Sequence, residues 1–377
     1  RPQAMSWSSA KYEFVAEGVP ITPYPDNPPS PGAKNYYPLM RLVARNSSNR
    51  ILATADVVLP GSDEMACSTC HASGSITDTR ALPTNLAMNP DPGKDYKLNI
   101  LQLHDDRHGT TLMASQPVLC ASCHASNALG TKGAPDTKPL TAALHSKHAF
   151  LDNGDQGSTR TACYSCHPGS ETKCLRGAMG NAGMQCQNCH GSMAQVGDSS
   201  RRGWLDEPAC ENCHTGTAVR NAGQIRYTDA FAYPGGALRE AADQRFAVNS
   251  GALYRLSDGH GNLACEACHG STHAIYPSSH ENDNLMVTRL QGHAGTLVEC
   301  SSCHPTNMEG KTGPHGMHPT GAWWADKHHD AVEKQGLASC RDCHGGDLRG
   351  TVLSAALADR TISTEHGTKT FAKGTII

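Results

Sequence analysis

The sequence predicts a mostly irregular fold, in which loops and short α-helices wrap around prosthetic groups and a small β-hairpin lies near the N-terminus. Three observations lead to this prediction. Among the 377 residues, Gly (37) and Pro (22) are plentiful, and both interrupt regular elements. Apolar residues make up only 38% and aromatic residues only 5%, which is too little for side chains alone to form ordinary cores. Sixteen of the 17 Cys fall into eight copies of one short motif.

That motif is Cys-x-x-Cys followed directly by His. It is the attachment signal for c-type heme: the two thiols form thioether bonds to the porphyrin, and the His becomes the proximal axial ligand of the iron. The thiol pairs are Cys67 and Cys70, Cys120 and Cys123, Cys163 and Cys166, Cys186 and Cys189, Cys210 and Cys213, Cys265 and Cys268, Cys300 and Cys303, and Cys340 and Cys343. The proximal ligands are then His71, His124, His167, His190, His214, His269, His304 and His344.

A Cys-x-x-Cys pair is also compatible with half of a zinc site or with a redox-active disulfide. Neither alternative requires His at the next position, and all eight pairs have one although the chain has only 21 His. We therefore expect eight covalent hemes of the c type. With about 47 residues for each heme, the porphyrins themselves should form much of the core.

The N-terminal segment, residues 1–60, contains neither Cys nor His. Apolar stretches at 37–43 and 50–59 flank the turn-forming run 46–49 and predict a β-hairpin. Six Pro within 20–32 predict an extended loop before it. This segment fits a passive cap and an interaction arm equally well.

The octaheme domain is expected at 61–350. Its motifs start 23 to 55 residues apart, so they do not form a solenoid of equal repeats. The three motifs that begin at positions 163, 186 and 210 are crowded, and we expect closely stacked hemes there. The motif-free gap 214–265 contains a Pro-Gly-Gly turn, which predicts a joint near 220–255. Residues 351–377 are expected to be a tail, with a short helix at 351–359.

Thirteen His lie outside the motifs, which is enough to give every iron a second His. Several form doublets three or four residues apart, a spacing that could present ligands to two adjacent hemes from one helical turn. A doublet could instead bind a separate metal ion, and Met could replace some His, but the surplus of His favours neither. We expect eight distal ligands to come from His104, His108, His145, His148, His260, His273, His293, His315, His318 and His328. The remaining three are expected at the surface: His280, His329 and His366.

Cys174 belongs to no complete motif. It could be a buried free thiol, a partner in an intermolecular disulfide, or a competitor for one thioether bond. The third interpretation arises because fourteen residues separate Cys174 from Cys189, which His190 follows. Cys174 would then compete with Cys186, whose two-residue spacing from Cys189 fits the heme better.

Charge and hydropathy restrict the classes of partner. The formal net charge is −3 and the basic residues are scattered, so we expect no nucleic-acid partner. No apolar run approaches 18 residues, so we expect no transmembrane segment. Because heme is attached to this motif outside the cytoplasm, we expect a secreted protein whose signal peptide has been removed. Extracellular and periplasmic locations remain open.

Several segments, taken together, resemble the OmcZ-like octaheme cytochromes that polymerise into extracellular nanowires. The resemblance covers roughly residues 60–360, and its most specific feature is the Cys-x14-Cys-His spacing from Cys174, since that family has one such attachment. Cys186 is a departure from the pattern. The resemblance implies His on both sides of every iron, a continuous stacked heme chain and little regular secondary structure. The segments that carry it are 163–167 with 173–177, 186–190, 259–273, 291–304, 313–318 and 349–353.

These observations predict an electron carrier without catalytic residues, which works as an extracellular filament built from copies of itself. Its redox partners would include extracellular acceptors such as minerals or electrodes. The alternative is an octaheme redox enzyme similar to hydroxylamine oxidoreductases or to nitrite and tetrathionate reductases. Such an enzyme needs an iron with an open position, and those reductases often replace the proximal His by Lys. No Cys-x-x-Cys-Lys occurs in the sequence, which favours the carrier.

Overall fold

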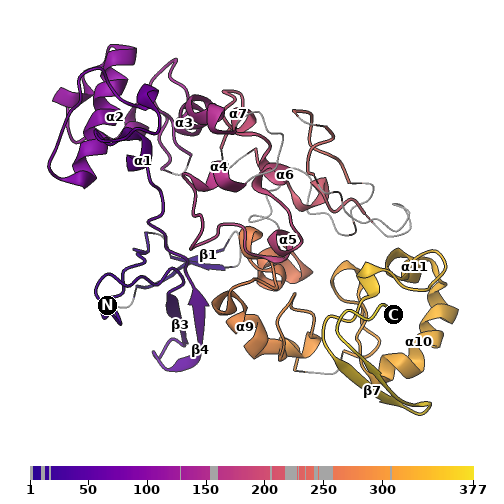
Figure 1. Cartoon of the computed structure of the whole chain (residues 1–377). Helices are drawn as coiled ribbons and strands as arrows, with labels where there is room; N and C mark the ends of the chain where they lie inside the picture. The colour runs from indigo at the N-terminus through magenta and orange to yellow at the C-terminus, as the bar shows by residue number, and fades with distance from the viewer. Residues whose placement is uncertain are drawn as a thin grey trace. The chain divides into compact units, whose positions relative to one another are not determined.

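Short helices and two-stranded antiparallel hairpins, joined by irregular segments, make up the chain in this computed structural model (Figure 1). The expected class of fold, with loops, short helices and an N-terminal hairpin, is thereby confirmed. Within the described part of the chain, no helix is both long and apolar enough to cross a membrane. The structure describes residues 3–9, 13–16, 18–127, 129–152, 160–203, 206–216, 227, 229–233, 235–241, 245, 258–305 and 308–377.

The chain divides into two compact units. The unit that holds the first three Cys-x-x-Cys-His motifs, here called the three-motif unit, consists of Ser62–Cys174 and Ser192–Asp206. The other, here called the five-motif unit, consists of Arg1–Gly61, Leu175–Gly191 and Glu207–Ile377. The N-terminal segment and the C-terminal tail, which the sequence set apart, therefore belong to one unit. The joint expected near 220–255 lies largely outside the described residues.

Helices and turns form the three-motif unit. Its longest helix, α2, begins where Asp91 accepts a hydrogen bond from the N–H of Gly93, next to Pro92 at the first helical position. It ends at Gly109, whose φ of 64° is the left-handed conformation that Gly adopts easily. The helices are α1 (Ser68–His71), α2 (Pro92–His108), α3 (Leu140–His148), α4 (Arg160–Tyr164) and α7 (Met193–Val196), with 3-10 turns at Thr79–Ala81, Leu112–Ala114, Cys120–Ser122 and Ala149–Asp152.

In its described residues, the five-motif unit combines helices with four hairpins. The short helix expected at 351–359 is only a 3-10 turn, because the chain after Ser354 pairs with the C-terminal residues instead. The helices are α5 (Ala178–Asn181), α6 (Cys186–His190), α8 (Cys265–His269), α9 (Glu281–Gln291), α10 (Ala322–Gln335) and α11 (Ala338–His344), with 3-10 turns at Cys210–Asn212, His260–Asn262, Thr272–Ala274, Cys300–Ser302, Pro314–Gly316 and Val352–Ser354.

Each hairpin is a separate two-stranded antiparallel sheet. The expected hairpin is confirmed as β3 and β4, which pair with Leu39 opposite Val58 and Val43 opposite Thr54. The turn between them places Asn49 at a φ of 61°, a conformation that Asn tolerates. The pairs are β1 (Ser6–Ser8) with β2 (Glu13–Val15), β3 (Leu39–Arg45) with β4 (Ile51–Val58), β5 (Asp258–Gly259) with β6 (Leu263–Ala264), and β7 (Arg360–Thr364) with β8 (Gly367–Phe371).

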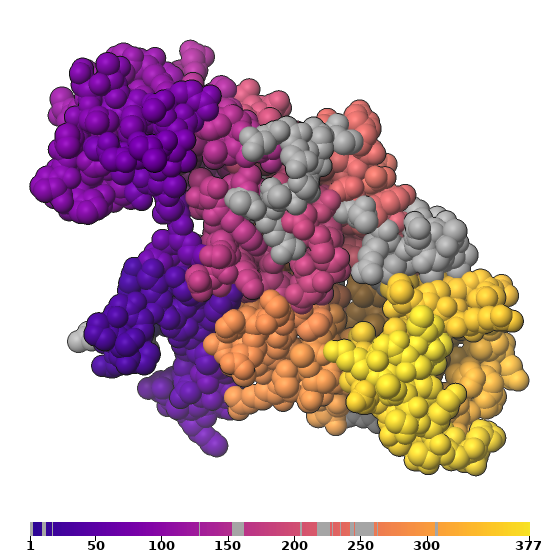
Figure 2. Space-filling view, viewed as in Figure 1, coloured from indigo at the N-terminus to yellow at the C-terminus, as the bar shows by residue number. Residues whose placement is uncertain are grey.

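Helices of the five-motif unit pack against two of these hairpins. Helix α9 contacts β4, and α10 contacts β7. The C-terminal residues, yellow in the space-filling view, form one continuous surface (Figure 2). The N-terminal hairpin and the C-terminal tail are therefore packed parts of the fold.

The side-chain core is thin. Most of the fully buried apolar residues in the described chain are alanines, and Val287 is the largest apolar side chain among the most deeply buried. Large apolar side chains instead remain at the surface, including Trp7 at 52%, Phe14 at 64% and Leu52 at 64% exposure. This agrees with the inference from composition that side chains alone supply little core.

Candidate heme sites

All eight Cys-x-x-Cys-His motifs fold into a single turn of helix. In five of them the His N–H donates to the carbonyl of the first Cys, at N···O distances of 2.8–3.0 Å. The other three motifs lie within α6, α8 and α11. One turn brings residues three and four apart onto the same face, which places both thiols and the imidazole together. The short spacing in sequence is therefore enough to build each half-site locally.

Seven of the eight motif His face a second His, and the distances between the ring centroids are nearly constant. These seven second His all belong to the expected pool of distal ligands. The pairs are His71 with His148 (6.3 Å), His124 with His104 (6.3 Å), His167 with His145 (6.1 Å), His190 with His273 (6.2 Å), His269 with His315 (6.2 Å), His304 with His260 (5.9 Å) and His344 with His318 (6.3 Å).

This spacing fits an ion held between two imidazoles. A metal–imidazole bond is about 2.0–2.1 Å long and the ligating nitrogen lies about 1.1 Å from the ring centre, so trans imidazoles have centroids about 6.3 Å apart. The angles between the ring planes vary from 11° to 84° while the distance stays the same. Direct packing of two rings does not explain a constant distance at variable angle, because stacked and edge-on pairs differ in separation. The residues therefore fit an iron with His on both sides.

Hydrogen bonds to Nδ1 direct the other ring nitrogen, Nε2, towards the ion. A carbonyl can only accept, so Nδ1 donates and Nε2 keeps its lone pair for a metal. Among the motif His, Nδ1 meets the main-chain oxygens of Ala81 (from His71), Lys138 (from His124) and Ile377 (from His344), each at 2.7 Å. Among the second His, Nδ1 meets the main-chain oxygens of Thr141 (from His145, 2.7 Å), Leu144 (from His148, 2.7 Å), Arg245 (from His315, 2.9 Å) and Pro319 (from His318, 3.0 Å).

Burial keeps several of these imidazoles in the neutral form that binds metals. Burial, with added repulsion from His315 and His214, lowers the pKa of His269 to about 4. Burial is also the largest cause of the lowered pKa at His71, His104, His167 and His318.

Burial suppresses ionisation of several motif thiols. Burial raises the pKa of Cys189 to about 11 and the pKa of both Cys210 and Cys213 to about 12. Thiol exchange requires the thiolate, so burial disfavours it at these Cys. No group of three or more His, Cys, Asp or Glu side chains that could hold a metal ion occurs among the described residues.

Two of the three His doublets serve two different motifs. In α3, His145 faces His167 and His148 faces His71. In the segment 313–318, His315 faces His269 and His318 faces His344. A three-residue spacing thus links two half-sites in each unit.

The third doublet behaves differently. His104 faces His124, whereas the ring of His108 packs 4.8 Å from that of His104. The hydroxyl of Thr110 donates to Asp105, so it accepts a hydrogen bond from Nδ1 of His104 at 2.9 Å. Helix α2 therefore orients one imidazole of its doublet towards a motif.

Thiols of different motifs lie close enough to affect one another. Burial is the largest cause of the raised pKa of Cys166, and the nearby thiols of Cys67 and Cys70 raise it further. In the five-motif unit, a thiol of another motif likewise raises the pKa of three Cys: Cys189 acts on Cys213, Cys265 on Cys210, and Cys303 on Cys268. Of the three motifs expected to be crowded, those that begin at 186 and 210 are thus neighbours. The motif that begins at 163 belongs to the three-motif unit, where the first motif is its neighbour.

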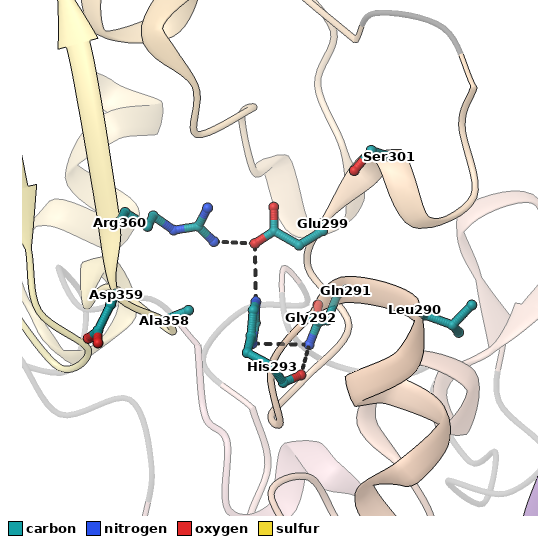
Figure 3. Close-up of a pocket in the computed structure, with 9 residues that line it drawn as sticks. All are labelled: Leu290, Gln291, Gly292, His293, Glu299, Ser301, Ala358, Asp359 and Arg360. Atoms are coloured by element: carbon teal, nitrogen blue, oxygen red, sulfur yellow. Dashed lines mark hydrogen bonds and ion pairs between the residues drawn. The ribbon is translucent and has the colours of Figure 1, made fainter.

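The structure gives His293 and His328 other contacts. Nε2 of His293 lies 3.2 Å from Oε1 of Glu299, which also pairs with Arg360 (Figure 3). Nδ1 of His328 meets the carbonyl of Ala325 at 2.9 Å. For these two residues, for His108 and for a second His opposite His214, axial ligation stays a prediction.

The Glu299 carboxylate borders a pocket of about 580 Å³ beside the motif that begins at Cys300. Burial opposes ionisation of this carboxylate, but hydrogen bonds from Arg360 and His293 lower its pKa. Within the pocket wall, the charge of Glu299 is therefore paired with that of Arg360. The lining residues are Leu290, Gln291, Gly292, His293, Glu299, Ser301, Ala358, Asp359 and Arg360.

The expected surface position is confirmed for His329 and His366, whose side chains are 59% and 80% exposed. For His280 it is wrong, because this residue is half-buried. Its Nδ1 accepts the N–H of Asn282 at the start of α9, and its ring stacks on Tyr37 at 3.6 Å.

Cys186 opens α6 and so has the same helical turn as the first Cys of the other motifs. Cys174 follows Lys173, whose φ is 45°, and its N–H donates to the carbonyl of Pro168. These positions favour Cys186 for the thioether, and the role of Cys174 stays a prediction.

Sequence reasoning missed the polar residues that support the first motif. Asn99 is fully buried and donates to the carbonyl of His71 at 3.0 Å and to the hydroxyl of Ser73 at 2.9 Å. Asp95, one turn earlier, accepts the N–H and the hydroxyl of Ser73, each at 2.7 Å. The sequence did offer one signal for this support: Asp95 and Asn99 are four residues apart and so lie on one face of a helix.

In comparisons with known proteins, the chain matches no protein-family model, and no curated protein or solved structure shows significant similarity to it. The candidate sites therefore rest on the motifs and on the geometry of this chain.

Proposed function

We propose that the chain is a multiheme c-type cytochrome that carries electrons along eight covalent hemes with His on both sides of each iron. The observation that carries this proposal is the constant spacing of seven motif His from seven second His, at 5.9–6.3 Å. Such a distance leaves room for one ion on the line between two imidazoles.

When bound, heme c supplies a one-electron iron couple. The residues of the chain determine how it is used. At the seven paired motifs two imidazoles would fill both axial positions and leave no open position for a substrate, which supports a carrier over a redox enzyme. The hydrogen bonds from Nδ1 to carbonyl oxygens strengthen the imidazoles as donors.

The eight-heme count and the ligation have direct tests. The intact mass should exceed that of the polypeptide by eight heme masses, and the excess should survive extraction with acid acetone. The reduced native protein should bind no carbon monoxide, and the resting protein should give only low-spin ferric signals. Seven or fewer hemes would contradict the count, and a high-spin ferric iron that binds carbon monoxide stoichiometrically would support the enzyme instead.

We propose further that the protein works outside the cell as a filament of its own copies, passing electrons to redox partners or to acceptors such as minerals or electrodes. What supports this is the surface of the N-terminal hairpins, where Trp7, Phe14, Ile51 and Leu52 are each at least half exposed. Both hairpins have only two strands, so their outer edges can accept another strand. A head-to-tail contact that does not close into a ring gives a filament.

Deletion of residues 1–35 tests this role. It removes β1 and β2 but leaves β3 and β4 in place. Filaments should be lost by electron microscopy while the heme spectra are retained. A wild-type protein that stays monomeric at high concentration would refute the filament and leave the electron-transfer proposal intact.

A further inference from the structure

The main chain of His273 is held by a neighbouring segment. Its carbonyl accepts the N–H of Arg176 at 2.9 Å and the N–H of Gly177 at 2.8 Å, and its ring faces that of His190 at 6.2 Å. A Cβ at Gly177 would lie 2.3 Å from the nitrogen of Ile275, so only Gly permits this close approach. The position of His273 therefore depends on the position of Arg176.

Arg176 is fixed by a buried ion pair with Asp283. Nε lies 2.6 Å from Oδ2 and Nη2 lies 3.0 Å from Oδ1, a two-point contact in which the side chains are only 8% and 4% exposed. The hydroxyl of Ser278 donates to Oδ2 at 2.6 Å. A buried pair of this kind holds its geometry firmly, because disturbing either partner leaves an uncompensated charge.

The N-terminal segment covers this ion pair through Tyr37, which is 8% exposed. The guanidinium carbon of Arg176 lies 5.4 Å from the centre of the Tyr37 ring. The ring also stacks on His280 at 3.6 Å, and the carbonyl of Tyr37 accepts from the side chain of Asn282 at 2.9 Å. Removing the ring would admit water to the ion pair and weaken its hold.

We propose that Tyr37 and the Arg176–Asp283 pair are positioning residues for His273, so that docking of the N-terminal segment keeps the iron opposite His190 closed to added ligands. The inference rests on the proposed function, because it takes His190 and His273 as axial ligands. Within the N-terminal segment, the proposal assigns this role to Tyr37.

The test is carbon monoxide binding by the reduced holoprotein with Tyr37→Ala, compared with wild type and two controls. Tyr37→Phe keeps the ring and should behave as wild type. Tyr24→Ala removes an aromatic side chain of the same segment that is 50% exposed, and it should also behave as wild type. Tyr37→Ala should bind up to one carbon monoxide per chain and show one high-spin ferric signal.

Hydrogen exchange gives a second readout that does not depend on heme spectra. The amides of Arg176 and Gly177 should exchange at least about tenfold faster in Tyr37→Ala, because their acceptor at His273 is loosened. If Tyr37→Ala does not accumulate, Tyr37→Leu keeps the apolar volume without the stacked ring and should show the same two changes. Unchanged exchange with no carbon monoxide bound in the alanine or leucine variant would overturn the proposal.

The outcomes separate this inference from the proposed function. Carbon monoxide binding by the wild-type protein would refute ligation by two His at every iron. No binding by wild type together with no effect in the Tyr37 variants would leave the carrier intact and remove the role of Tyr37.

Discussion

The two units present paired His with the same three-residue spacing but hold them by different means. In the three-motif unit, α3 is a regular helix, and its own carbonyls at Thr141 and Leu144 accept the hydrogen bonds of His145 and His148. In the five-motif unit, the 3-10 turn Pro314–Gly316 places His315 at a φ of 56°. Its Nδ1 meets the carbonyl of Arg245, which is far away in sequence.

This difference teaches that a helix can orient two candidate ligands through its own carbonyls, whereas the loop also draws on contacts from other segments. Several contacts from outside the loop support it, including a hydrogen bond from the guanidinium of Arg245 to the carbonyl of His315 at 3.3 Å. Arg245 accepts from His315, and the ring of Trp324 stacks on that of His318 at 4.0 Å. Substitutions in other segments should therefore disturb His315 and His318 of the loop more than His145 and His148 of α3.

The largest effect should come from removing each doublet completely. His145→Ala with His148→Ala should open two irons, and His315→Ala with His318→Ala should open two others. Each double variant should bind two carbon monoxide molecules per chain, measured by titration of the reduced protein. His329→Ala removes an exposed His as a control and should bind none. Binding of one or none by either double variant would show that its two His do not serve separate irons.

A backbone change should separate the loop from the helix. Gly316 has a φ of 77°, so Gly316→Ala forces a left-handed conformation at a cost of about 1–2 kcal/mol. Its Cβ would also lie 2.6 Å from Nη1 of Arg245. We expect part of the protein to bind one carbon monoxide. The matched change Ala142→Gly in α3 should lower stability by about 1 kcal/mol without opening an iron. Carbon monoxide binding by this variant would show that α3 and the loop do not differ in this respect.

A smaller effect is expected from the side chain of Arg245. Its guanidinium pairs with Asp342 inside the last motif and donates to the carbonyl of His315 at 3.3 Å, whereas the group that holds the imidazole of His315 is the main-chain carbonyl of Arg245. Arg245→Gln should leave all irons low-spin and shift the ferric signal of at least one heme in electron paramagnetic resonance. Arg245→Lys should restore most of the wild-type signal. A high-spin iron in Arg245→Gln would show that the guanidinium itself holds His315.

The smallest effect tests the three-motif unit, where a carboxylate holds a loop next to a motif. Glu64 accepts the N–H groups of Gly169, Glu171 and Thr172 at 3.2, 2.8 and 2.8 Å. Burial opposes ionisation of Glu64, but these hydrogen bonds lower its pKa. The stabilisation is therefore present above the unfolded pKa and is lost as the pH falls through the folded pKa.

Glu64→Gln should thus lower the unfolding temperature at neutral pH, and its difference from wild type should shrink below about pH 4. Thermal unfolding followed by circular dichroism between pH 3 and 7 measures this. Glu171→Gln changes an exposed side chain of the same loop and serves as the control. A difference that stays constant over this pH range would exclude the ionised carboxylate as its cause.

Local features of these sites could be predicted from the sequence, and distant ones could not. The motifs determine their own helical turns because all the necessary residues lie within five positions. The hairpin of β3 and β4 follows from its turn residues, and the His doublets indicated that one turn can serve two motifs. The partner of each motif His was not predictable, because His190 and His273, for example, are brought together only by tertiary contacts such as those of Arg176.

Two His that contact other groups show the same limit: His293, from the expected distal pool, and His280, which was expected at the surface. His293 is drawn to a carboxylate that Arg360, from the C-terminal hairpin, holds in place, and that hairpin was itself expected to be a tail. His280 became a helix cap because Tyr37 from the N-terminal segment packs on it. In each case a residue distant in sequence decides the role of the imidazole.

The position of α3 also sets the order in which its unit can fold. The helix bridges a motif that precedes it and a motif that follows it, and it packs against α7, which comes later still. When a chain emerges N-terminal end first, His71 has no partner until α3 has emerged, and α3 is not fully seated until α7 has followed. The steps that complete the first site are therefore non-local, and such contacts form slowly. The first motif is therefore paired later than the second, because both His104 and His124 precede α3 in the chain.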